Sequence, residues 1–234
     1  MKKVLITGAN SYVGTNVEKW LMKEPENFYV ETLDMKDPNW KVFDFSKFDV
    51  VFHVAGIAHV SKKKTLDDLY YKVNRDLAIE TAKKVKESGV NHFIFMSSMI
   101  IYGEDNNIGN KTHIDINKYN PVNAYGNSKL QADLEIQKLQ NDKFNISIVR
   151  TPIIYGPNCK GNFPKLQKMA SIMFLVPKIT NQKSMIYIDN FAEFIKQLIC
   201  HSSIGVFYPQ NAKYMSTSEI VMITRHFKRK RTIL

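Results

Sequence analysis

The chain of 234 residues has little cysteine, no long apolar run and no clustered histidine. Its two cysteines, Cys159 and Cys200, stand at unrelated positions, which is typical of free thiols in a reducing compartment rather than of a disulfide framework. No apolar run is long enough to span a membrane, and the N-terminus enters a strand pattern directly, so neither a membrane segment nor a signal peptide is expected. The six histidines are scattered, so no metal site is expected. The sequence therefore predicts a single cytoplasmic protein.

Positive charge is in excess, with a formal net charge of +11 and a sequence pI near 9.4. Such a charge permits contact with nucleic acid or with an anionic membrane. Most lysines, however, are spread over helical patterns, as in Lys83–Lys86, and only Lys62–Lys64 and Phe227–Arg231 form dense basic runs. We therefore expect no nucleic-acid partner, and we interpret the charge as a field that attracts an anionic small molecule.

Strand-like and helix-like patterns alternate along the first 150 residues. The expected strands are 3–7, 29–33, 49–54, 92–96 and 146–150. The helical patterns between them are 14–23, 66–88 and 125–140. Strands separated by crossover helices predict an α/β fold with a doubly wound parallel sheet of the Rossmann type.

The first strand is followed by a glycine loop. Gly8 permits a tight turn and Gly14 lets the next helix pack closely, the arrangement in which backbone N–H groups hold a pyrophosphate. Ser11 stands where the usual motif has its middle glycine, which weakens the signal. Asp34 ends the next strand, where a carboxylate accepts hydrogen bonds from a ribose and repels a 2′-phosphate, although a strand-ending aspartate that begins a turn looks the same. We expect NAD rather than NADP.

Tyr125 and Lys129 lie one helical turn apart on the same face. An unperturbed phenol has a pKa of about 10, and a nearby ammonium favours its ionised form, so the tyrosine can exchange a proton near neutral pH. The same pair also occurs in ordinary amphipathic helices. We favour the catalytic interpretation because the chain also has the glycine loop near its N-terminus.

Taken together, these motifs make the chain resemble the extended short-chain dehydrogenase/reductase family of nucleotide-sugar epimerases and dehydratases. The similarity covers nearly the whole length. The matching pieces, in family order, are Thr7-Gly-Ala-Asn-Ser-Tyr-Val-Gly14, Asp34, Val42-Phe-Asp-Phe45, Asp49–Gly56, Val73-Asn74, Phe93–Ser98 with Ile101-Tyr-Gly103, Tyr125-x-x-x-Lys129, Arg150–Pro157 and Ile186–Asn190.

The resemblance implies a role for each matching residue. Ser98 would hydrogen-bond the reacting sugar oxygen, Tyr125 would be the general acid/base, and Lys129 would bind the nicotinamide ribose and depress the Tyr125 pKa. Asp44 and Phe45 would hold the adenine of NAD. The full set of implied NAD-binding residues is Gly8, Asn10, Ser11, Tyr12, Val13, Gly14, Asp34, Asp44, Phe45, Ala55, Gly56, Asn74, Tyr125, Lys129, Pro152 and Ile153. Asn162 and Lys183, with Ser98, would contact a nucleotide-diphosphate sugar. Both Asn162 and Lys183 fit surface loop positions equally well.

The reaction that the resemblance implies depends on the two residues directly after Ser98. A dehydratase of the family has an acidic pair there, whereas this chain has Met99 and Ile100, which transfer no proton. The expected function is thus an NAD-dependent UDP-sugar 4-epimerase supplying surface or capsular polysaccharide precursors. An NAD(P)H-dependent ketoreductase, to which the Pro152 variant also points, is the alternative, and a non-catalytic NAD-binding module is disfavoured. A homodimer is an option.

Beyond residue 150, proline and glycine interrupt the pattern. We expect 1–150 and 186–204, with a helix at 189–200, to form the NAD-binding domain. Residues 151–185 and 205–234 would form a small substrate-binding lobe woven from loops. Within it, Ser216 to Phe227 reads as a helix with Glu219 completing a capping box. Family members usually continue past this point, so the chain is expected to be either naturally short or truncated.

Overall fold

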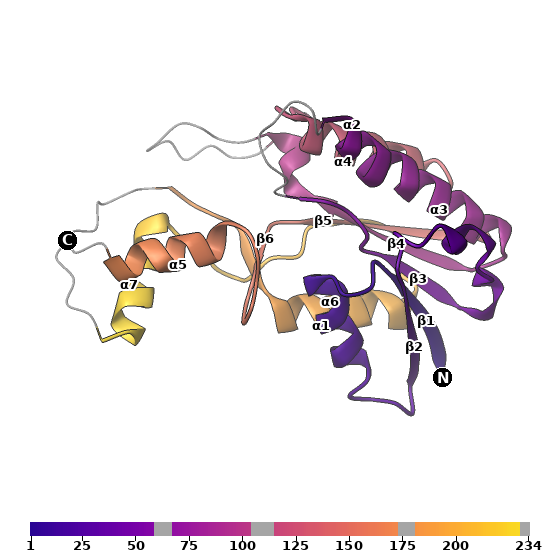
Figure 1. Ribbon diagram of the computed structural model, residues 1–234, viewed down its shortest axis with the longest axis horizontal. Helices are drawn as coiled ribbons and strands as arrows, with labels where there is room; N and C mark the ends of the chain where they lie inside the picture. Colours follow the sequence, from indigo (N-terminus) through magenta and orange to yellow (C-terminus); the bar gives the residue numbers. More distant parts are fainter. Residues whose placement is uncertain (59–66, 104–114, 173–180, 230–234) are drawn as a thin grey trace.

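The computed structural model describes residues 1–58, 67–103, 115–172 and 181–229. Its centre is a sheet of six strands, all parallel, in the order β2-β1-β3-β4-β5-β8 (Figure 1). The strands are β1 (Lys2–Thr7), β2 (Phe28–Leu33), β3 (Val50–His53), β4 (His92–Ser98), β5 (Asn145–Thr151) and β8 (Gly205–Phe207). The five strands expected from the sequence are confirmed to within a few residues.

Helices cover both faces of this sheet. The helices α1 (Tyr12–Leu21) and α6 (Ile188–His201) lie on one face, and α2 (Asp67–Tyr70), α3 (Leu77–Glu87) and α4 (Ala124–Gln137) lie on the other (Figure 1). A π-helical turn, η4 (Tyr71–Asp76), joins α2 to α3 where one continuous helix was expected. The doubly wound α/β architecture predicted from the sequence is confirmed.

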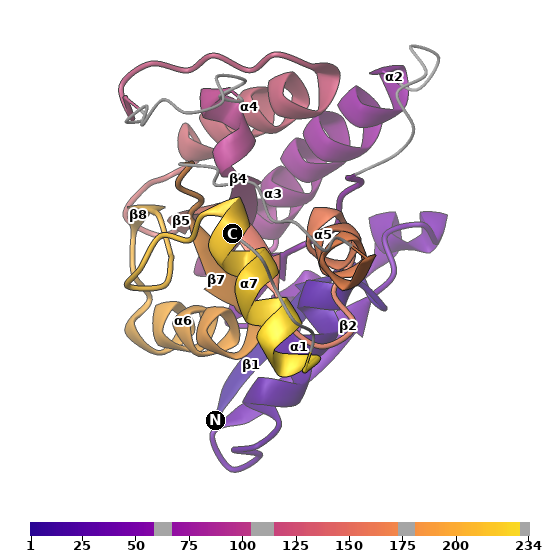
Figure 2. The same cartoon turned by 90° about the vertical axis from the view of Figure 1, so that its left-hand side faces the viewer.

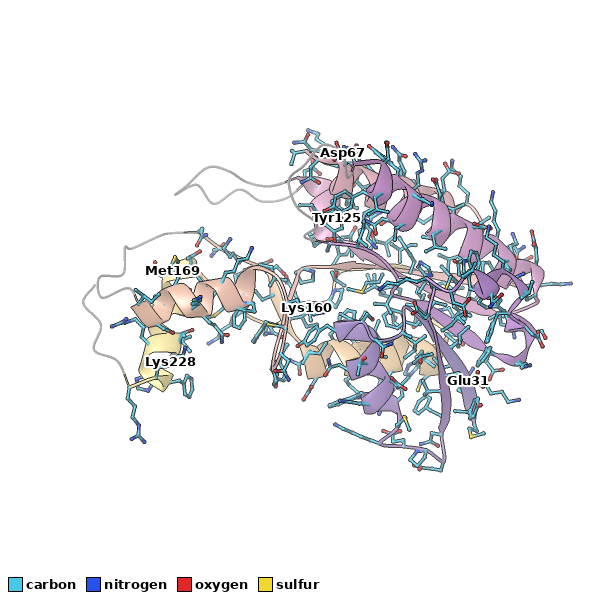
Figure 3. The ribbon with its side chains drawn as sticks, in the orientation of Figure 1. Glu31, Asp67, Tyr125, Lys160, Met169 and Lys228 are labelled. Carbon is cyan, nitrogen blue, oxygen red and sulfur yellow. The ribbon has the colours of Figure 1, made fainter. Side chains whose placement is uncertain are left out.

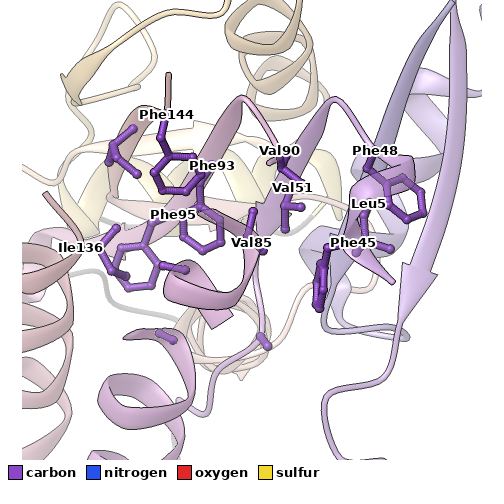
Figure 4. Close-up of a cluster of buried hydrophobic side chains, with 14 of the residues drawn as sticks. Leu5, Phe45, Phe48, Val51, Val85, Val90, Phe93, Phe95, Ile136 and Phe144 are labelled. Atoms are coloured by element: carbon purple, nitrogen blue, oxygen red, sulfur yellow. The ribbon is translucent and has the colours of Figure 1, made fainter. Parts of the chain in front are cut away.

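Successive strand residues alternate between the two faces, and both sets are buried. Leu5, Val51 and Phe93 face α3 and α4, whereas Val4, Val50 and Ile94 face α1 and α6. Figure 4 shows the first of these clusters. A parallel sheet buried on both sides requires strands that are apolar at nearly every position, which explains the near-continuous apolar runs in the sequence.

Residues 34–49 contain no strand. They form two short 3-10 helices, η1 (Pro38–Val42) and η2 (Phe45–Lys47), so the chain passes directly from the edge strand β2 to the central β3. The strand order reverses between β1 and β3, whose following helices lie on opposite faces. In doubly wound sheets ligands bind at such a reversal, beyond the carboxyl ends of the strands.

Residues beyond 150 differ from the loop-woven lobe that was expected. They include two short strands, β6 (Ile153–Tyr155) and β7 (Met185–Tyr187), which pair in parallel, and the helix α5 (Asn162–Ile172). The helix α7 (Thr217–Phe227) packs beside α5 (Figure 2), and both lie away from the sheet (Figure 1). Its predicted capping box of Ser216 and Glu219 is confirmed. Residues 205–207, expected in the lobe, instead form β8 at the edge of the main sheet.

Candidate functional site

The glycine loop lies between the ends of β1 and β3. Gly8 has φ +103°, and a Cβ atom there would lie 2.8 Å from the backbone nitrogen of Ala55, so only glycine fits without strain. At Gly14 a Cβ atom would lie 3.2 Å from Val54 Cγ1, which confirms the close approach of α1 to β3. This crossing brings the start of α1 over the edge at which the strand order reverses.

Ser11 has a local structural role that glycine would lack. Its side chain accepts a hydrogen bond from Gly14 N at 3.0 Å and so caps the first turn of α1, which begins at Tyr12 rather than near Gly14. Asn10 has φ +63°, which leaves the loop backbone in a tight turn. Together with Val13, these residues place the helix N-terminus where a pyrophosphate is expected, so the residues present fit a dinucleotide.

A cleft of about 380 Å³ opens beside this loop. Asn10, Ser11 and Tyr12 line one side, and Lys160 and the start of α6 line the other. Figure 3 shows Lys160 at the junction between the sheet and the α5–α7 pair, well away from Met169 and Lys228. The cleft therefore places residues of the expected substrate lobe next to the glycine loop.

The two residues expected near the adenine differ in the groups they can offer a ligand. Asp44 is exposed but already accepts hydrogen bonds from Ser46 N at 3.0 Å and Ser46 Oγ at 2.6 Å, as the cap of η2. Phe45 is fully buried in the core and packs against Phe43. The Phe45 side chain therefore belongs to the core, and a contact of this residue with the adenine stays a prediction.

Asp34 stands directly after β2, as expected, and is exposed. One of its carboxylate oxygens accepts a hydrogen bond from Lys36 N at 3.0 Å. This turn fixes the direction of the carboxylate beyond the carboxyl end of β2. The contact of Asp34 with a ribose hydroxyl stays a prediction.

Gly56 and Asn74 connect the cofactor loop to the proton-transfer residues. Asn74 is fully buried, and its amide both accepts from Ile57 N at 2.8 Å and donates to Ile57 O at 3.0 Å. A Cβ atom on Gly56 would lie 3.0 Å from Asn74 Oδ1 and 3.3 Å from Lys129 Nζ. The end of β3 therefore passes directly beside Lys129.

Ser98, Tyr125 and Lys129, expected to be catalytic, meet at the carboxyl end of β4. Ser98 ends the strand and Tyr125 stands in the first turn of α4, where the Ser98 side chain lowers the pKa of the Tyr125 phenol. Asn123 caps that turn by accepting from Gly126 N at 2.8 Å. Figure 3 shows Tyr125 on the helical layer that covers this face, at the end nearer to α5 and α7.

The ionisation of this group differs from the sequence-based expectation. Burial raises the pKa of Tyr125, while the Ser98 side chain lowers it and Tyr70, whose ring centroid lies 5.7 Å away, raises it. Lys129 is buried and donates from Nζ to Met96 O at 2.9 Å. Burial lowers the pKa of Lys129 to about 8, opposed by the nearby Asp133. The expectation that Lys129 depresses the Tyr125 pKa is therefore corrected: burial raises this pKa, and the group that lowers it is Ser98.

The remaining expected residues lie after β5. Pro152 and Ile153 lead from β5 into β6, and Ile153 is exposed. The backbone of Lys183 pairs with Met215, with N–O distances of 2.9 and 3.1 Å, so this segment joins the base of α7. Asn162 begins α5, and its side chain lies outside the described part of the structure.

Sequence reasoning missed a buried ion pair behind the catalytic face of α4. Asp133, one turn beyond Lys129, contacts Arg150 of β5 at 2.8 Å, and both side chains are almost completely buried. The sequence did offer one signal for Asp133, because it follows Lys129 at the same four-residue spacing that separates Lys129 from Tyr125. A partner 17 residues away could not be read from it.

Among the described residues, no group of three or more His, Cys, Asp or Glu side chains is arranged to hold a metal ion. No described helix combines the length and apolar character needed to cross a bilayer.

Comparison with known proteins gives consistent matches. Residues 4–203 match the model of the NAD dependent epimerase/dehydratase family. The chain is 30% identical over 243 residues to the UDP-glucose 4-epimerase of Vibrio cholerae, covering 94% of this chain and 74% of that protein. It is 30% identical over 219 residues to an N-acetyl-alpha-D-glucosaminyl-diphospho-ditrans,octacis-undecaprenol 4-epimerase of Escherichia coli O157:H7, covering 86% of this chain and 64% of that one. The chain thus spans less than two thirds of the second relative.

Solved structures share the fold. A UDP-glucuronic acid 4-epimerase from Bacillus cereus, in complex with NAD, superposes with a TM-score of 0.78 at 20% identity, covering 98% of this chain and 84% of that one. A dTDP-4-dehydrorhamnose reductase from Clostridium acetobutylicum superposes with a TM-score of 0.80 at 22% identity, covering 99% and 82%. Epimerases and reductases match about equally, so this likeness establishes the fold and does not discriminate between the reactions.

Proposed function

The chain belongs to the NAD-dependent epimerase/dehydratase family, as an NAD-dependent enzyme of the extended short-chain dehydrogenase/reductase type, and we propose that it inverts C4 of a UDP-sugar. The observation that carries the proposal is the meeting of Ser98, Tyr125 and Lys129 beside Gly56. The proposal is supported because a phenol and an ammonium beside the end of β3, where the glycine loop fits a dinucleotide, are the groups that such a proton transfer would need.

The residues of the site would act in turn on one hydroxyl group of the sugar. Ser98 would hold its oxygen by a hydrogen bond, and Tyr125, as phenolate, would take its proton. NAD, when bound, supplies the acceptor and donor of a hydride for the same carbon. After the ketosugar turns over, Tyr125 would return the proton to the newly formed hydroxyl on the opposite face, so the reaction leaves no net change in oxidation state.

Protonation of Lys129 supports this cycle. Its ammonium lies one turn from Tyr125 and would bind the nicotinamide ribose of NAD. Its contact with Met96 O holds the ammonium at the end of β4, in reach of the region beside Gly56. The site thus combines a fixed charge that would hold the ribose with Ser98, which offsets part of the raised pKa that burial gives Tyr125.

The residues after Ser98 favour epimerisation over dehydration. Met99 and Ile100 enter the short 3-10 helix η5 (Met99–Tyr102), and neither side chain can transfer a proton. Elimination of water needs a further acid and base at this place. A ketoreductase remains the second candidate, because Pro152 in the segment after β5 also suits a reductase.

A direct assay separates the two candidates. We expect UDP-glucose and the purified protein with NAD to give UDP-galactose, with no lasting gain or loss of NADH. A panel of UDP-, GDP- and dTDP-sugars, analysed by chromatography and proton NMR, identifies the preferred substrate. Net oxidation of added NADH by a 4-ketosugar, without interconversion of any sugar in the panel, would replace the epimerase proposal by the reductase.

The proposal includes a cellular setting. A UDP-sugar product would serve the synthesis of a surface or capsular polysaccharide in the cytoplasm, and the enzyme would act as a homodimer. Light scattering on the purified protein measures the mass directly, and a monomeric mass at working concentration would contradict the dimer.

A further inference from the structure

Three successive residues at the end of β4 contact three residues of α4 that lie one turn apart. Met96 O accepts from Lys129 Nζ at 2.9 Å, Ser97 Oγ donates to Asp133 Oδ2 at 2.6 Å, and the Ser98 side chain faces Tyr125 closely enough to lower its pKa. Only the last of these contacts joins two groups that would handle the substrate. The position of α4 along β4 therefore decides whether the Ser98 and Tyr125 hydroxyls meet.

Asp133 is the best anchored residue of the three on α4. Its side chain is fully buried and accepts four hydrogen bonds. Two come from Arg150, from Nε at 3.0 Å and from Nη2 at 2.8 Å, and the others come from Ser97 and from Gln137 at 2.7 Å. A planar guanidinium that meets a carboxylate with two parallel bonds fixes direction as well as distance.

Arg150 is itself held on every side. Besides Asp133, its guanidinium donates to the hydroxyls of Tyr102, Tyr208 and Tyr119, and the three rings surround it with centroids 5.2 to 5.8 Å away. Burial lowers the pKa of Arg150, but Asp133 outweighs this and keeps the pKa above its ordinary value, so the guanidinium stays charged. The ion pair thus links α4 to β5, which contains Arg150. Through the tyrosines it also links α4 to the segments that follow β4 and β8.

We propose that the Asp133–Arg150 pair is a positioning device that sets α4 against the end of β4 and so brings the Tyr125 and Ser98 hydroxyls together. Asp133 raises the pKa of the nearby Lys129, and apart from this electrostatic effect the pair acts through Ser97 and α4. The catalytic consequence rests on the proposed epimerase function, whereas the geometric consequence, the Ser98–Tyr125 contact, does not.

The first test measures that contact without substrate. Asp133→Leu combined with Arg150→Met removes both charges at once, so that neither is left buried alone. Labelling with 3-fluorotyrosine brings phenol ionisation to a lower pH, and the fluorine resonance of residue 125 is identified by its loss in Tyr125→Phe. Because the Ser98 side chain lowers the pKa of Tyr125, moving the two hydroxyls apart in the double variant should raise that pKa further.

The matched control acts on the same two strands at their other ends. His92 Nε2 and Ser147 Oγ lie 2.8 Å apart and join the start of β4 to β5, far from α4's catalytic turn. Ser147→Ala should leave the Tyr125 resonance and turnover unchanged. Ser97→Ala, which removes the link from β4 to Asp133 and keeps the ion pair, should shift the Tyr125 pKa in the same direction as the double variant but less.

Kinetics with the sugar identified by the substrate panel complete the test. Misplacing the proton-transfer group should lower kcat by up to about 100-fold in the double variant, with the KM for sugar and the affinity for NAD nearly unchanged. A folded double variant with an unshifted Tyr125 pKa would overturn the proposal, whatever the reaction is. If the double variant does not fold, Ser97→Ala provides the test instead. An unshifted Tyr125 pKa in that variant would also overturn the proposal. A shifted pKa in a protein that turns over no sugar would support the positioning device and reject the epimerase.

Discussion

The α4–β4 contact belongs to the main α/β body, whereas the α5–α7 pair lies beyond the sheet, and the two regions are built very differently (Figure 1). The first joins two elements through two successive hydrogen bonds, and its Asp133 forms a buried ion pair with Arg150. The second has a small apolar core of Ala170 and Val221, with Leu166 and Met222 packed against it. Ile172 and Phe227, at the ends of these helices, are 77% and 82% exposed. The proposed proton transfer needs fixed distances, and the buried polar contacts between α4 and β4 provide them. The α5–α7 pair buries fewer side chains and is therefore held less firmly.

The largest expected effect falls on the well-anchored side. Tyr125→Phe keeps the ring but removes the proton-transfer group, so turnover should fall roughly 10²–10⁴-fold. The fold and NAD affinity should stay nearly intact. Rate measurements on the preferred sugar, together with a titration of NAD, check both parts. Near-full turnover by the variant would remove Tyr125 from the mechanism.

A pair of core substitutions measures the difference between the two regions in stability. Phe93 is fully buried beside His53 and Phe144, so Phe93→Ala should destabilise the protein by about 3–5 kcal/mol. Leu166→Ala removes a partly buried side chain and should cost less than about 2 kcal/mol. Urea unfolding followed by circular dichroism compares them. Equal losses would mean that the α5–α7 pair is as integral to the fold as the sheet.

Lys129 should make activity and stability respond to pH in opposite directions. Burial lowers its pKa to about 8, so the folded protein releases this proton earlier than the unfolded chain does. Above about pH 8 the unfolded chain therefore binds more protons, and the contribution of Lys129 to stability rises with pH, whereas activity, which needs the ammonium, falls. Profiles of kcat/KM and of urea unfolding test this. In Lys129→Met the rise in stability should disappear, and its persistence would assign it to another group.

Cofactor choice should depend on Asp34 alone among the residues after β2. Its exposed carboxylate would repel a 2′-phosphate, and removing one such charge interaction in water is worth roughly 1 kcal/mol. NAD should bind more tightly than NADP, and Asp34→Ala should narrow the gap about fivefold. Calorimetry with both cofactors measures it, and Asp37→Ala, in the next turn, is the control. Equal affinities in the unchanged protein would favour the reductase.

The smallest expected effect concerns Lys183. If its ammonium contacts a phosphate of the substrate, Lys183→Ala should weaken UDP binding by about 0.2–1 kcal/mol and leave NAD unaffected, because a partly exposed lysine lacks the fork of an arginine. Lys160→Ala, beside the glycine loop, is the matched comparison. Indistinguishable UDP affinities of Lys183→Ala and the parent would mean that the nucleotide lies elsewhere.

The sequence predicted the features that depend on local pattern. Strands β1 to β5 have four to seven residues and are rich in apolar side chains, so their pattern is visible in the sequence. The capping box of Ser216 needs only Glu219, three residues later, so it could be predicted as well. Strands β6, β7 and β8 have three residues each, too few for a period to show. Helix α5 was missed because Pro164 suggested a loop, although proline is tolerated in a first helical turn.

Tertiary partners lay beyond this reasoning. The Tyr125–Lys129 spacing identified the face of α4, but the contact of Lys129 with Met96 O and the burial that raises the Tyr125 pKa depend on packing. Phe45 matched a family position and proved to be core. Spacing along one helix specifies which side chains share a face, and only the fold specifies the groups that this face meets.

The five bonds of Arg150 also set an order of events during synthesis. Asp133 leaves the ribosome 17 residues before Arg150, and Tyr208 follows Arg150 by 58 residues. At typical rates of translation, about 5–20 residues per second, the guanidinium waits roughly 3–12 s for its last acceptor. Until β8 has emerged and paired with the edge of the sheet, the Arg150 guanidinium of the nascent chain lacks the hydrogen-bond acceptor that Tyr208 provides. During that interval β5 is an open edge of the sheet, and such an edge can pair with another chain until β8 covers it.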